Sequence, residues 1–566
     1  MDLGVSKGKK NGKKVSTIKN PVLRGFNPDP SIIRVGDDYY IATSTFEWFP
    51  GVQIHHSRDL VNWHLLSRAL TRTSQLDLRG NPNSAGVWAP DLSYHDGMFY
   101  LIYTDVKSLD WIYNDSHNYL VTATDIIGPW SEPIYLNSSG FDPSLFHDED
   151  GRKWLLNMQW DFRPNRNTFA GILIQEYSPS EQKLVGPIRN IFKGTSIKVT
   201  EGPHLYRRDG YYHLLTAEGG TVYEHAVTMA RSKDIFGPYE VHPQNPVLTS
   251  SDDRELPLQK AGHASLVETQ QGEWYMVHLV GRPLKPQLAC NLGRETALQK
   301  CYWGSDGWLQ LSNGTNKPDV EVQAPDLPAF PFESALERDD FDSPALSIDL
   351  NSLRIPVDEC WLSLTERPGY LRLRGMESLS SWNRQSLIAR RQQAFRCEAE
   401  TCLEFEPETF QQMAGLICLY DTRNYFYLCV SYDEEAGKSL RIMDCDRGEY
   451  SEPLDLPVSL DRLERIYLKV TVDYDALQFY YSQDGQTWHK VGPVLASSRL
   501  SDEYCASARG SFTGSFIGMC AQDLTGCRSV ADFDYFEYRE FPGIDDAPVQ
   551  NKETEFFGDL LSNIPA

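Results

Sequence analysis

This chain of 566 residues lacks the features that mark several common classes of protein. Its eleven cysteines begin only at Cys290, and none forms a Cys-x-x-Cys pair or a metal-finger spacing. No hydrophobic run is long enough to cross a bilayer, and the N-terminus lacks the apolar stretch of a secretory signal. We therefore expect reduced thiols, no membrane association and a cytoplasmic location.

Positive charge is also scarce, because the formal net charge is −24 at pH 7. Proteins that bind nucleic acid normally carry a basic surface, so we expect no nucleic-acid partner. The one basic stretch runs from Lys7 to Lys19 and is rich in Gly, Lys and Ser. It fits either a nucleic-acid or targeting arm or an unstructured leader, and we interpret residues 1–20 as a disordered basic leader.

Helical periodicity is weak along the whole chain, whereas short alternating strands separated by Gly, Asp and Asn turns are frequent. Aromatic residues are abundant, with 13 Trp, 29 Tyr and 25 Phe. Such residues favour β-sheet cores, and they also form surfaces on which sugar rings stack. The composition therefore predicts an all-β protein.

A short phrase recurs five times in the first half of the chain, and its copies begin 60, 53, 60 and 61 residues apart. Each copy is followed by a turn and an aromatic-rich strand. A fixed long period of this kind is typical of a β-propeller, so five copies predict five blades. The copies are Asp29-Pro30-Ser31-Ile32, Ala89-Pro90-Asp91-Leu92, Asp142-Pro143-Ser144-Leu145, Gly202-Pro203-His204-Leu205 and His263-Ala264-Ser265-Leu266.

The repeats also predict the domain organisation. Residues 21–325 are expected to form the five-bladed propeller, and residues 326–337, which include Pro328 and Pro331, a linker. Short alternating strands in residues 338–541 predict a β-sandwich. Residues 542–566 are interpreted as a tail.

Acidic residues stand at or beside equivalent positions of the repeat. Asp29 and Asp142 occupy the same place in copies one and three, and Glu201 immediately precedes copy four. Because matching positions of the blades converge on the axis, these carboxyl groups are candidates for the acid and base of glycoside hydrolysis. The alternative for an Asp before Pro is a turn cap without chemistry. His263, in copy five, is either a core residue or a ligand for a cation or water.

A second motif points to a different class of propeller. Residues 482–488 match the Asp-box of sialidases, and residues 57–63 match it in part. Asp-boxes are hairpin turns that carry no catalysis, and nothing marks the arginine triad and tyrosine nucleophile of a sialidase. We therefore interpret both segments as structural turns.

Several segments together resemble glycoside hydrolase family 43, and within it the two-domain β-xylosidase group. The resemblance covers about residues 18 to 540 and implies a five-bladed propeller followed by a β-sandwich. It implies an exo-acting, inverting β-D-xylosidase that releases xylose from the non-reducing ends of xylo-oligosaccharides, with α-L-arabinofuranosidase side activity. The matching segments are 25–31, 42–51, 88–91, 139–146, 200–206 and 261–265.

The resemblance gives each carboxyl group a role. Asp29 is similar to the general base that deprotonates the attacking water, and Glu201 to the general acid that protonates the leaving group. Asp142 is similar to a third carboxylate that orients the acid and raises its pKa.

The resemblance also implies six substrate-binding residues. Arg294 matches an arginine that binds sugar hydroxyls, and Phe512 an aromatic residue that the sandwich inserts into the pocket mouth. His263 matches a pocket-floor histidine that in related enzymes contacts a divalent cation, often calcium, although the chemistry itself implies no cofactor. The other three are aromatic pocket walls: Phe46, Trp88 and Trp160.

Two alternatives stay open, a principal α-L-arabinofuranosidase and a non-catalytic carbohydrate-binding propeller. A dedicated metalloenzyme is a weaker option, because no ligand cluster is readable in the sequence. Relatives tend to be dimers or tetramers, so a homo-oligomer is expected. The segment between Gly281 and Gly293 is shorter than the group's pattern, so leaving-group specificity and subunit contacts are not carried over.

Overall fold

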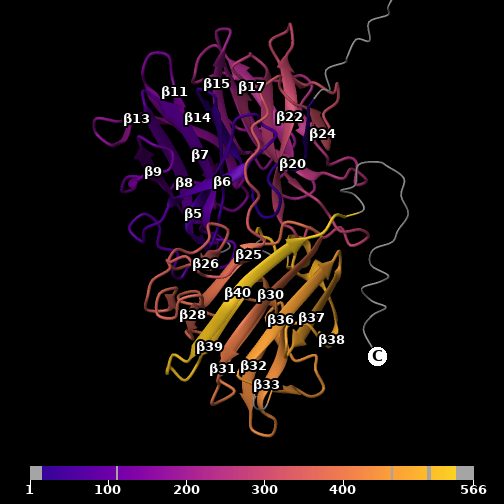
Figure 1. Cartoon of the computed structure of the whole chain (residues 1–566). Helices are drawn as coiled ribbons and strands as arrows, with labels where there is room; N and C mark the ends of the chain where they lie inside the picture. Colours follow the sequence, from indigo (N-terminus) through magenta and orange to yellow (C-terminus); the bar gives the residue numbers. More distant parts are fainter. Residues whose placement is uncertain (1–15, 110–111, 461–462, 506–510, 544–566) are drawn as a thin grey trace, which may run out of the picture.

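The computed structural model describes residues 16–109, 112–460, 463–505 and 511–543. Figure 1 shows two bodies, with the N-terminal half above and a C-terminal domain of long strands below. Within the described residues, the helices are a 3₁₀ turn, η1 (Ser497–Arg499), and one short α-helix, α1 (Asp502–Cys505). No helix in this part of the chain has the length and hydropathy to cross a membrane.

Five small antiparallel sheets make up most of the N-terminal half, and each is formed by strands that are close together in sequence. Two-residue Asp-Gly turns close several of these hairpins: Asp96 and Gly97 have φ values of 50° and 77°, and Asp209 and Gly210 values of 48° and 78°. The blades are β2 (Ser31–Val35), β3 (Asp38–Thr43), β5 (Gly51–Ser57) and β6 (His64–Leu70); β7 (Gly86–His95), β8 (Met98–Ser108), β9 (Asp115–Ala123) and β10 (Ile134–Asn137); β11 (Ser144–His147), β12 (Lys153–Trp160), β13 (Phe169–Ser178) and β14 (Lys183–Phe192); β15 (Glu201–Arg208), β16 (Tyr211–Glu218), β17 (Ala226–Ser232), β18 (Glu240–Val241) and β19 (Leu248–Thr249); and β20 (Gln259–Glu268), β21 (Trp274–Gly281), β22 (Arg294–Trp303) and β23 (Leu309–Leu311).

The first strand of each blade lies at the centre of the ring. Strand β2 contacts β7 and β20, β11 contacts β7 and β15, and β15 contacts β20, so the five inner strands surround one axis. Each inner strand contains all or the last part of one copy of the repeated phrase. The predicted five-bladed propeller is therefore confirmed.

The N-terminal segment lies against blade five. Strand β1 (Thr17–Lys19) pairs antiparallel with β24 (Glu321–Gln323), and Asn20 exchanges two hydrogen bonds of 2.8 Å with the backbone of Leu298 in blade five. The interpretation of residues 1–20 as a disordered leader is wrong for residues 17–19, because Ile18 is fully buried. Residues 1–15 lie outside the described residues, as do residues 544–566 of the expected tail.

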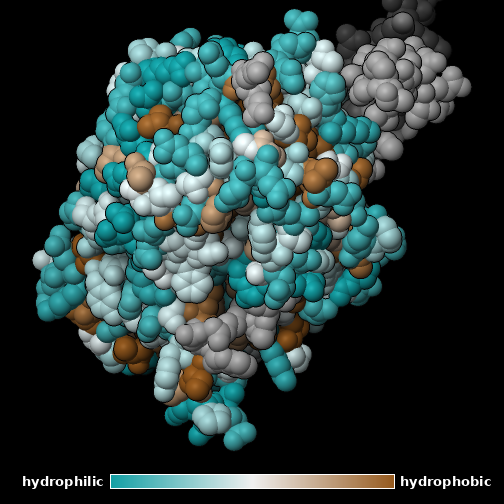
Figure 2. Space-filling view, turned by 90° about the horizontal axis from the view of Figure 1, so that it is seen from below, coloured by the Kyte–Doolittle hydropathy of each residue, from teal (hydrophilic) through white to brown (hydrophobic). Residues whose placement is uncertain are grey.

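The C-terminal domain consists of two packed antiparallel sheets whose inner faces form one apolar core, as predicted for a β-sandwich. One sheet contains β25 (Arg338–Asp339), β27 (Leu362–Ser363), β28 (Leu371–Arg374), β30 (Arg396–Phe405), β36 (Arg465–Asp473), β37 (Ala476–Ser482), β38 (His489–Ala496) and β40 (Val530–Glu540). The other contains β4 (Trp48–Phe49), β26 (Asn351–Leu353), β29 (Ser386–Arg391), β31 (Gln412–Asp421), β32 (Asn424–Asp433), β33 (Gly437–Asp446), β34 (Glu449–Ser451), β35 (Val458–Ser459) and β39 (Phe516–Asp523). On the face shown in Figure 2, hydrophobic residues lie in small groups among hydrophilic ones.

One strand of the second sheet comes from the propeller half. Strand β4 follows β3 in sequence, but it pairs with β26 through Ser352–Phe49 and Leu353–Trp48. The Trp48 ring stacks on Phe516 of β39 at a centroid distance of 3.8 Å, and both side chains are buried. This shared strand and its aromatic core fix the sandwich against the propeller.

Both Asp-box segments are local turns, as interpreted. Asp484 accepts hydrogen bonds from the backbone N–H groups of Gln486 and Thr487, at the β37–β38 connection. Asp59 holds the turn after β5 in the same way.

Candidate active site

A cavity of about 440 Å³ lies at one end of the propeller axis. Phe512 of the sandwich lines it, so this end of the axis faces the sandwich. All nine side chains proposed from the sequence line it: Asp29, Phe46, Trp88, Asp142, Trp160, Glu201, His263, Arg294 and Phe512. The sequence reasoning missed eight further lining residues: Leu109, Asn114, Phe141, Phe169, Val199, Gly220, Thr221 and Val222. Phe141 directly precedes Asp142 and could have been found from the repeat, whereas the loop residues carry no pattern.

A repeated backbone conformation delivers residues to this cavity. The first residue of each phrase has a positive φ: 54° at Asp29, 33° at Ala89, 53° at Asp142, 55° at Gly202 and 47° at His263. For residues other than glycine this conformation costs about 1–2 kcal/mol. It recurs just before or in the first half of each inner strand, and in three blades the strand pairing shifts register there, as in a β-bulge that re-aims a side chain.

Asp29 is buried and surrounded by positive charge and hydrogen-bond donors. Its two carboxylate oxygens accept hydrogen bonds from Arg294 Nη1 at 3.0 Å and from Ser44 Oγ at 2.7 Å. Burial alone would raise the pKa of Asp29, but the Arg294 guanidinium and the Ser44 hydrogen bond outweigh it and lower the pKa. Asp29 is therefore ionised and can accept a proton.

The other two carboxyl groups have the opposite tendency. Burial, followed by the negative charge of Asp29, raises the pKa of Asp142, although the Gly202 N–H donates to its Oδ2 at 3.1 Å. Burial and the charges of Asp142 and Asp29 raise the pKa of Glu201 well above its usual value. The raised pKa favours the protonated form of Glu201, which can donate a proton.

Arg294 joins the propeller to the sandwich inside this site. It is 2% exposed, and its Nη1 also donates to Thr221 Oγ1 at 2.9 Å, while its Nη2 donates to the carbonyl of Phe512 at 2.9 Å. One guanidinium group thus positions the base, a loop of blade four and the residue that the sandwich contributes.

Aromatic rings form the walls of the cavity. The Trp88 ring lies 5.9 Å from Phe46, 5.2 Å from Phe141 and 5.8 Å from Phe512, measured between centroids. Phe141 also lies 6.0 Å from Trp160. Flat apolar rings around buried carboxyl groups suit a sugar, whose ring faces are apolar and whose edges carry hydroxyl groups.

His263 is buried and lines the cavity, and burial lowers the pKa of its imidazole, which favours the neutral form. Within the described ranges, no group of three or more His, Cys, Asp or Glu residues could hold a metal ion. Calcium prefers six to eight oxygen ligands, and one neutral imidazole does not supply such a set. The expectation of a metal at His263 is not confirmed, and we derive no step from a cation.

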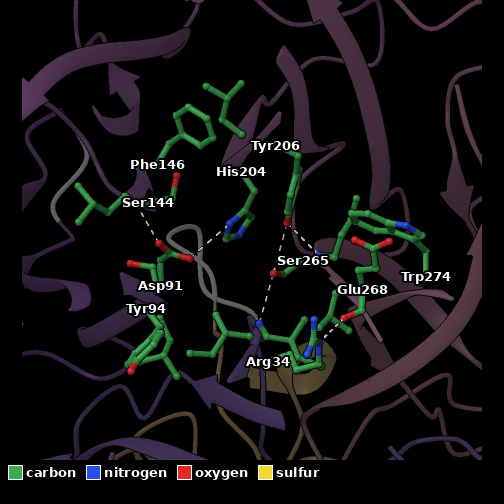
Figure 3. Close-up of a pocket in the computed structure, with 18 residues that line it drawn as sticks. Arg34, Asp91, Tyr94, Ser144, Phe146, His204, Tyr206, Ser265, Glu268 and Trp274 are labelled. Atoms are coloured by element: carbon green, nitrogen blue, oxygen red, sulfur yellow. Dashed lines mark hydrogen bonds and ion pairs between the residues drawn. The ribbon is translucent and has the colours of Figure 1, made fainter. Parts of the chain in front are cut away.

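A second cavity, of about 320 Å³, lies at the opposite end of the five inner strands (Figure 3). Later residues of the same phrases line it, and Asp91 and His204 point toward one another across it. Their contact is 3.5 Å, burial raises the pKa of Asp91 to about 7, and burial lowers that of His204 to about 3. We interpret this contact as one in which the imidazole carries no charge at neutral pH.

Asp91 connects three blades at this end of the axis. It accepts hydrogen bonds from Ser31 Oγ at 3.0 Å and from the Leu145 N–H at 2.9 Å. We expect Asp91→Ala to lower the free energy of unfolding by about 3 kcal/mol, because both buried donors lose their acceptor. Urea unfolding measures this change. Asp37→Ala, which removes an exposed turn carboxylate, is the control, and equal midpoints for the two variants would contradict the prediction.

Comparison with known proteins agrees with this geometry. A family model described as Glycosyl hydrolases family 43 matches residues 18–309, and one described as Beta xylosidase C-terminal Concanavalin A-like domain matches residues 338–539. A Bacillus subtilis (strain 168) protein named Beta-xylosidase is 55% identical over 533 residues, covering 92% of this chain and 99% of that protein. A Humicola insolens protein named Xylosidase/arabinosidase 43B is 52% identical over 530 residues, covering 92% and 97%. The crystal structure of a xylan beta-1,4-xylosidase from Bacillus halodurans C-125 is 61% identical with a TM-score of 0.91, covering 92% of this chain and 100% of that one.

Proposed function

Since this chain belongs to glycosyl hydrolases family 43, we propose that it is an exo-acting, inverting β-D-xylosidase that releases xylose from the non-reducing ends of xylo-oligosaccharides. The observation that supports this best is an aromatic pocket in which the pKa of one carboxyl group, Asp29, is lowered and that of another, Glu201, is raised well above its usual value. Carboxyl groups whose pKa values are driven apart are the requirement for acid and base work at one pH.

In the proposed mechanism, the terminal xylose lies among Phe46, Trp88 and Phe512. Glu201 donates its proton to the glycosidic oxygen as the bond to the anomeric carbon breaks. Asp29 accepts a proton from a water that attacks the anomeric carbon from the opposite face. The β-linked sugar therefore leaves as α-xylose, and one water is consumed in each turnover.

Asp142 has an indirect role in this proposal. Its Oδ2 accepts the N–H of Gly202, the residue after Glu201, so it orients the segment that carries the acid. Its proximity also raises the pKa of Glu201.

Phe512 and Arg294 support the exo mode. Phe512 comes from the sandwich, and its carbonyl is bonded to Arg294 inside the pocket. A wall from the second domain leaves room for a chain end rather than for a continuous chain.

Proton NMR of xylobiose hydrolysis tests the proposal. The first anomeric signal to appear should be that of α-xylose. If β-xylose appeared first, the substrate assignment would stand but the inverting mechanism would be wrong, because one carboxylate would then act as a nucleophile. Absence of xylose would favour the arabinofuranosidase or the non-catalytic alternative.

A principal α-L-arabinofuranosidase is the second candidate, supported by the relative named Xylosidase/arabinosidase 43B. The ratio of kcat/KM on matched aryl β-xyloside and α-arabinofuranoside substrates separates the two. A ratio above one favours the xylosidase.

The pH profile of kcat/KM should depend on Arg294. Activity requires Asp29 ionised and Glu201 protonated, so it falls below the pKa of Asp29 and above that of Glu201. Arg294→Met removes a cation that lowers the pKa of Asp29, so the acid limb should move to higher pH by about one pH unit. Arg79→Met, which breaks an exposed Arg–Asp pair in the connection between blades one and two, should leave it in place. An unmoved acid limb in the Arg294 variant would contradict the assignment of the base.

Two further expectations remain predictions. All eleven cysteines are free, nine of them buried, which supports a reducing, cytoplasmic location, and fractionation of the source cells measures it. Assembly into a dimer or tetramer rests on the family resemblance, and light scattering of the purified protein measures it.

A further inference from the structure

A lysine is fully buried between the two domains. Lys260, in β20 of blade five, is 2% exposed and lies three residues before His263. Its Nζ is 2.5 Å from Glu503 Oε1 and 3.5 Å from Asp502 Oδ2, and both carboxyl groups belong to α1 of the sandwich. Removing one partner of a buried ion pair leaves an uncompensated charge, so this contact strongly constrains α1.

The ion pair continues toward the pocket through buried hydrogen bonds. Tyr420 of β31 is 1% exposed, and its hydroxyl donates to Asp502 Oδ1 at 2.6 Å. The same hydroxyl accepts the N–H of Thr513 at 3.2 Å, and the Thr513 hydroxyl donates to the Tyr420 carbonyl at 3.2 Å. Thr513 directly follows Phe512, so three contacts connect Lys260 to the pocket wall.

The propeller segment between β21 and β22 also contacts α1 and the backbone that follows Phe512. The Cys290 N–H donates to Glu503 Oε2 at 2.8 Å, and the Asn291 carbonyl accepts the N–H of Ser515 at 3.0 Å. Gly293 has a φ of 74°, and a Cβ there would lie 2.7 Å from the Thr513 carbonyl oxygen. The backbone around Phe512 therefore lies directly against the propeller loop that leads to Arg294.

We propose that Lys260 is a positioning residue, which holds Phe512 at the pocket mouth through Asp502 and Tyr420 and so sets the affinity for the terminal sugar. The proposal rests on the proposed function. The Phe512 ring lies 5.8 Å from Trp88 and 6.5 Å from Phe46, so its displacement widens the sugar-binding pocket. Lys260 does not line this cavity, so we expect the reacting carboxyl groups to keep their own contacts when it is replaced.

Lys260→Met tests this, because methionine keeps much of the length and removes the charge. We expect KM for an aryl β-xyloside and the Kd for xylose, from calorimetry, to rise about tenfold, with kcat changed less than about threefold. Lys300→Met is the matched control, since it removes a lysine–glutamate pair of 2.7 Å within blade five, and it should change neither constant.

A double variant separates positioning from general stability. If Lys260 acts through Phe512, then Lys260→Met should add less than about a twofold change in KM to Phe512→Ala. Two results would overturn the proposal. One is a further tenfold rise in KM when Lys260→Met is added to Phe512→Ala, and the other is an unchanged KM in Lys260→Met alone. If Lys260→Met does not fold, Glu503→Gln keeps the side-chain shape, and it should raise KM in the same direction. The proposed function has its own test and would be wrong if the unaltered protein hydrolysed no glycoside. The role of Lys260 could still be tested in that case, because the Kd for xylose does not depend on hydrolysis.

Discussion

Glu201→Ala should lower the rate of xylobiose hydrolysis by about 10³-fold, while hydrolysis of a 4-nitrophenyl β-xyloside should fall far less. The sugar leaving group of xylobiose is a poor one and needs the proton that Glu201 donates. Nitrophenolate leaves without protonation, so loss of the acid affects it less. Steady-state rates on the two substrates measure the difference, and the basic limb of the pH profile should disappear together with the acid.

Glu218→Gln provides the matched control for this experiment. Glu218 is also a buried carboxyl group of blade four, but it accepts hydrogen bonds from Thr195 and Thr200 and does not line the cavity. Its substitution should leave the ratio of the two rates unchanged. An equal loss on both substrates in the Glu201 variant would contradict its role as the acid.

Asp29→Ala should reduce both rates alike, by about 10³-fold or more. Water must attack whatever the leaving group is, so a good leaving group offers no relief when the base is absent. The ratio of rates on xylobiose and on the aryl xyloside should therefore stay near that of the unaltered protein. This pattern is the opposite of that expected for Glu201.

Azide separates the two roles further. Azide needs no deprotonation, so in Asp29→Ala it should attack the anomeric carbon from the face that water used. The aryl xyloside would then give α-xylosyl azide and nitrophenolate, which NMR identifies. A β-xylosyl azide would place the missing group on the other face of the sugar and would contradict Asp29 as the base.

Lys260 and Arg294 extend these predictions to the domain interface. The Arg294 side chain contacts Asp29 and the Phe512 carbonyl, so its replacement should affect both pH dependence and KM. Lys260 reaches Phe512 only through the sandwich, so its replacement should affect KM alone. The two variants thus distinguish a group that tunes the base from one that positions the pocket wall.

Much of the propeller could be predicted because its information is local and repeated. Each phrase combines a residue at positive φ, an inner strand and a tight turn, and five copies of one unit close into a ring. Equivalent positions must then meet at the axis, which is why Asp29, Asp142 and His263 could be placed together before any coordinates. The family resemblance added Arg294 and Phe512.

Other parts of the fold have no such signal. Nothing in residues 17–19 indicates that they pair with residues 321–323, and nothing in Trp48–Phe49 indicates a strand of the sandwich. These pairings join residues about three hundred positions apart and depend on which surfaces remain to be covered once each domain has formed. Thr221 and Val222 reach the pocket for the same reason, from a loop without periodicity.

The sequence by itself thus determined the number of blades, the presence of a second β domain and the residues that converge on the axis, because repetition and strand alternation are written along the chain. Only the tertiary structure decided which carboxyl group is ionised. An arginine 265 residues away in the chain lowers the pKa of Asp29. Burial and the carboxylates of other blades raise the pKa of Glu201. Protonation depends on distance and burial in three dimensions, and neither is encoded by the spacing of residues in the chain.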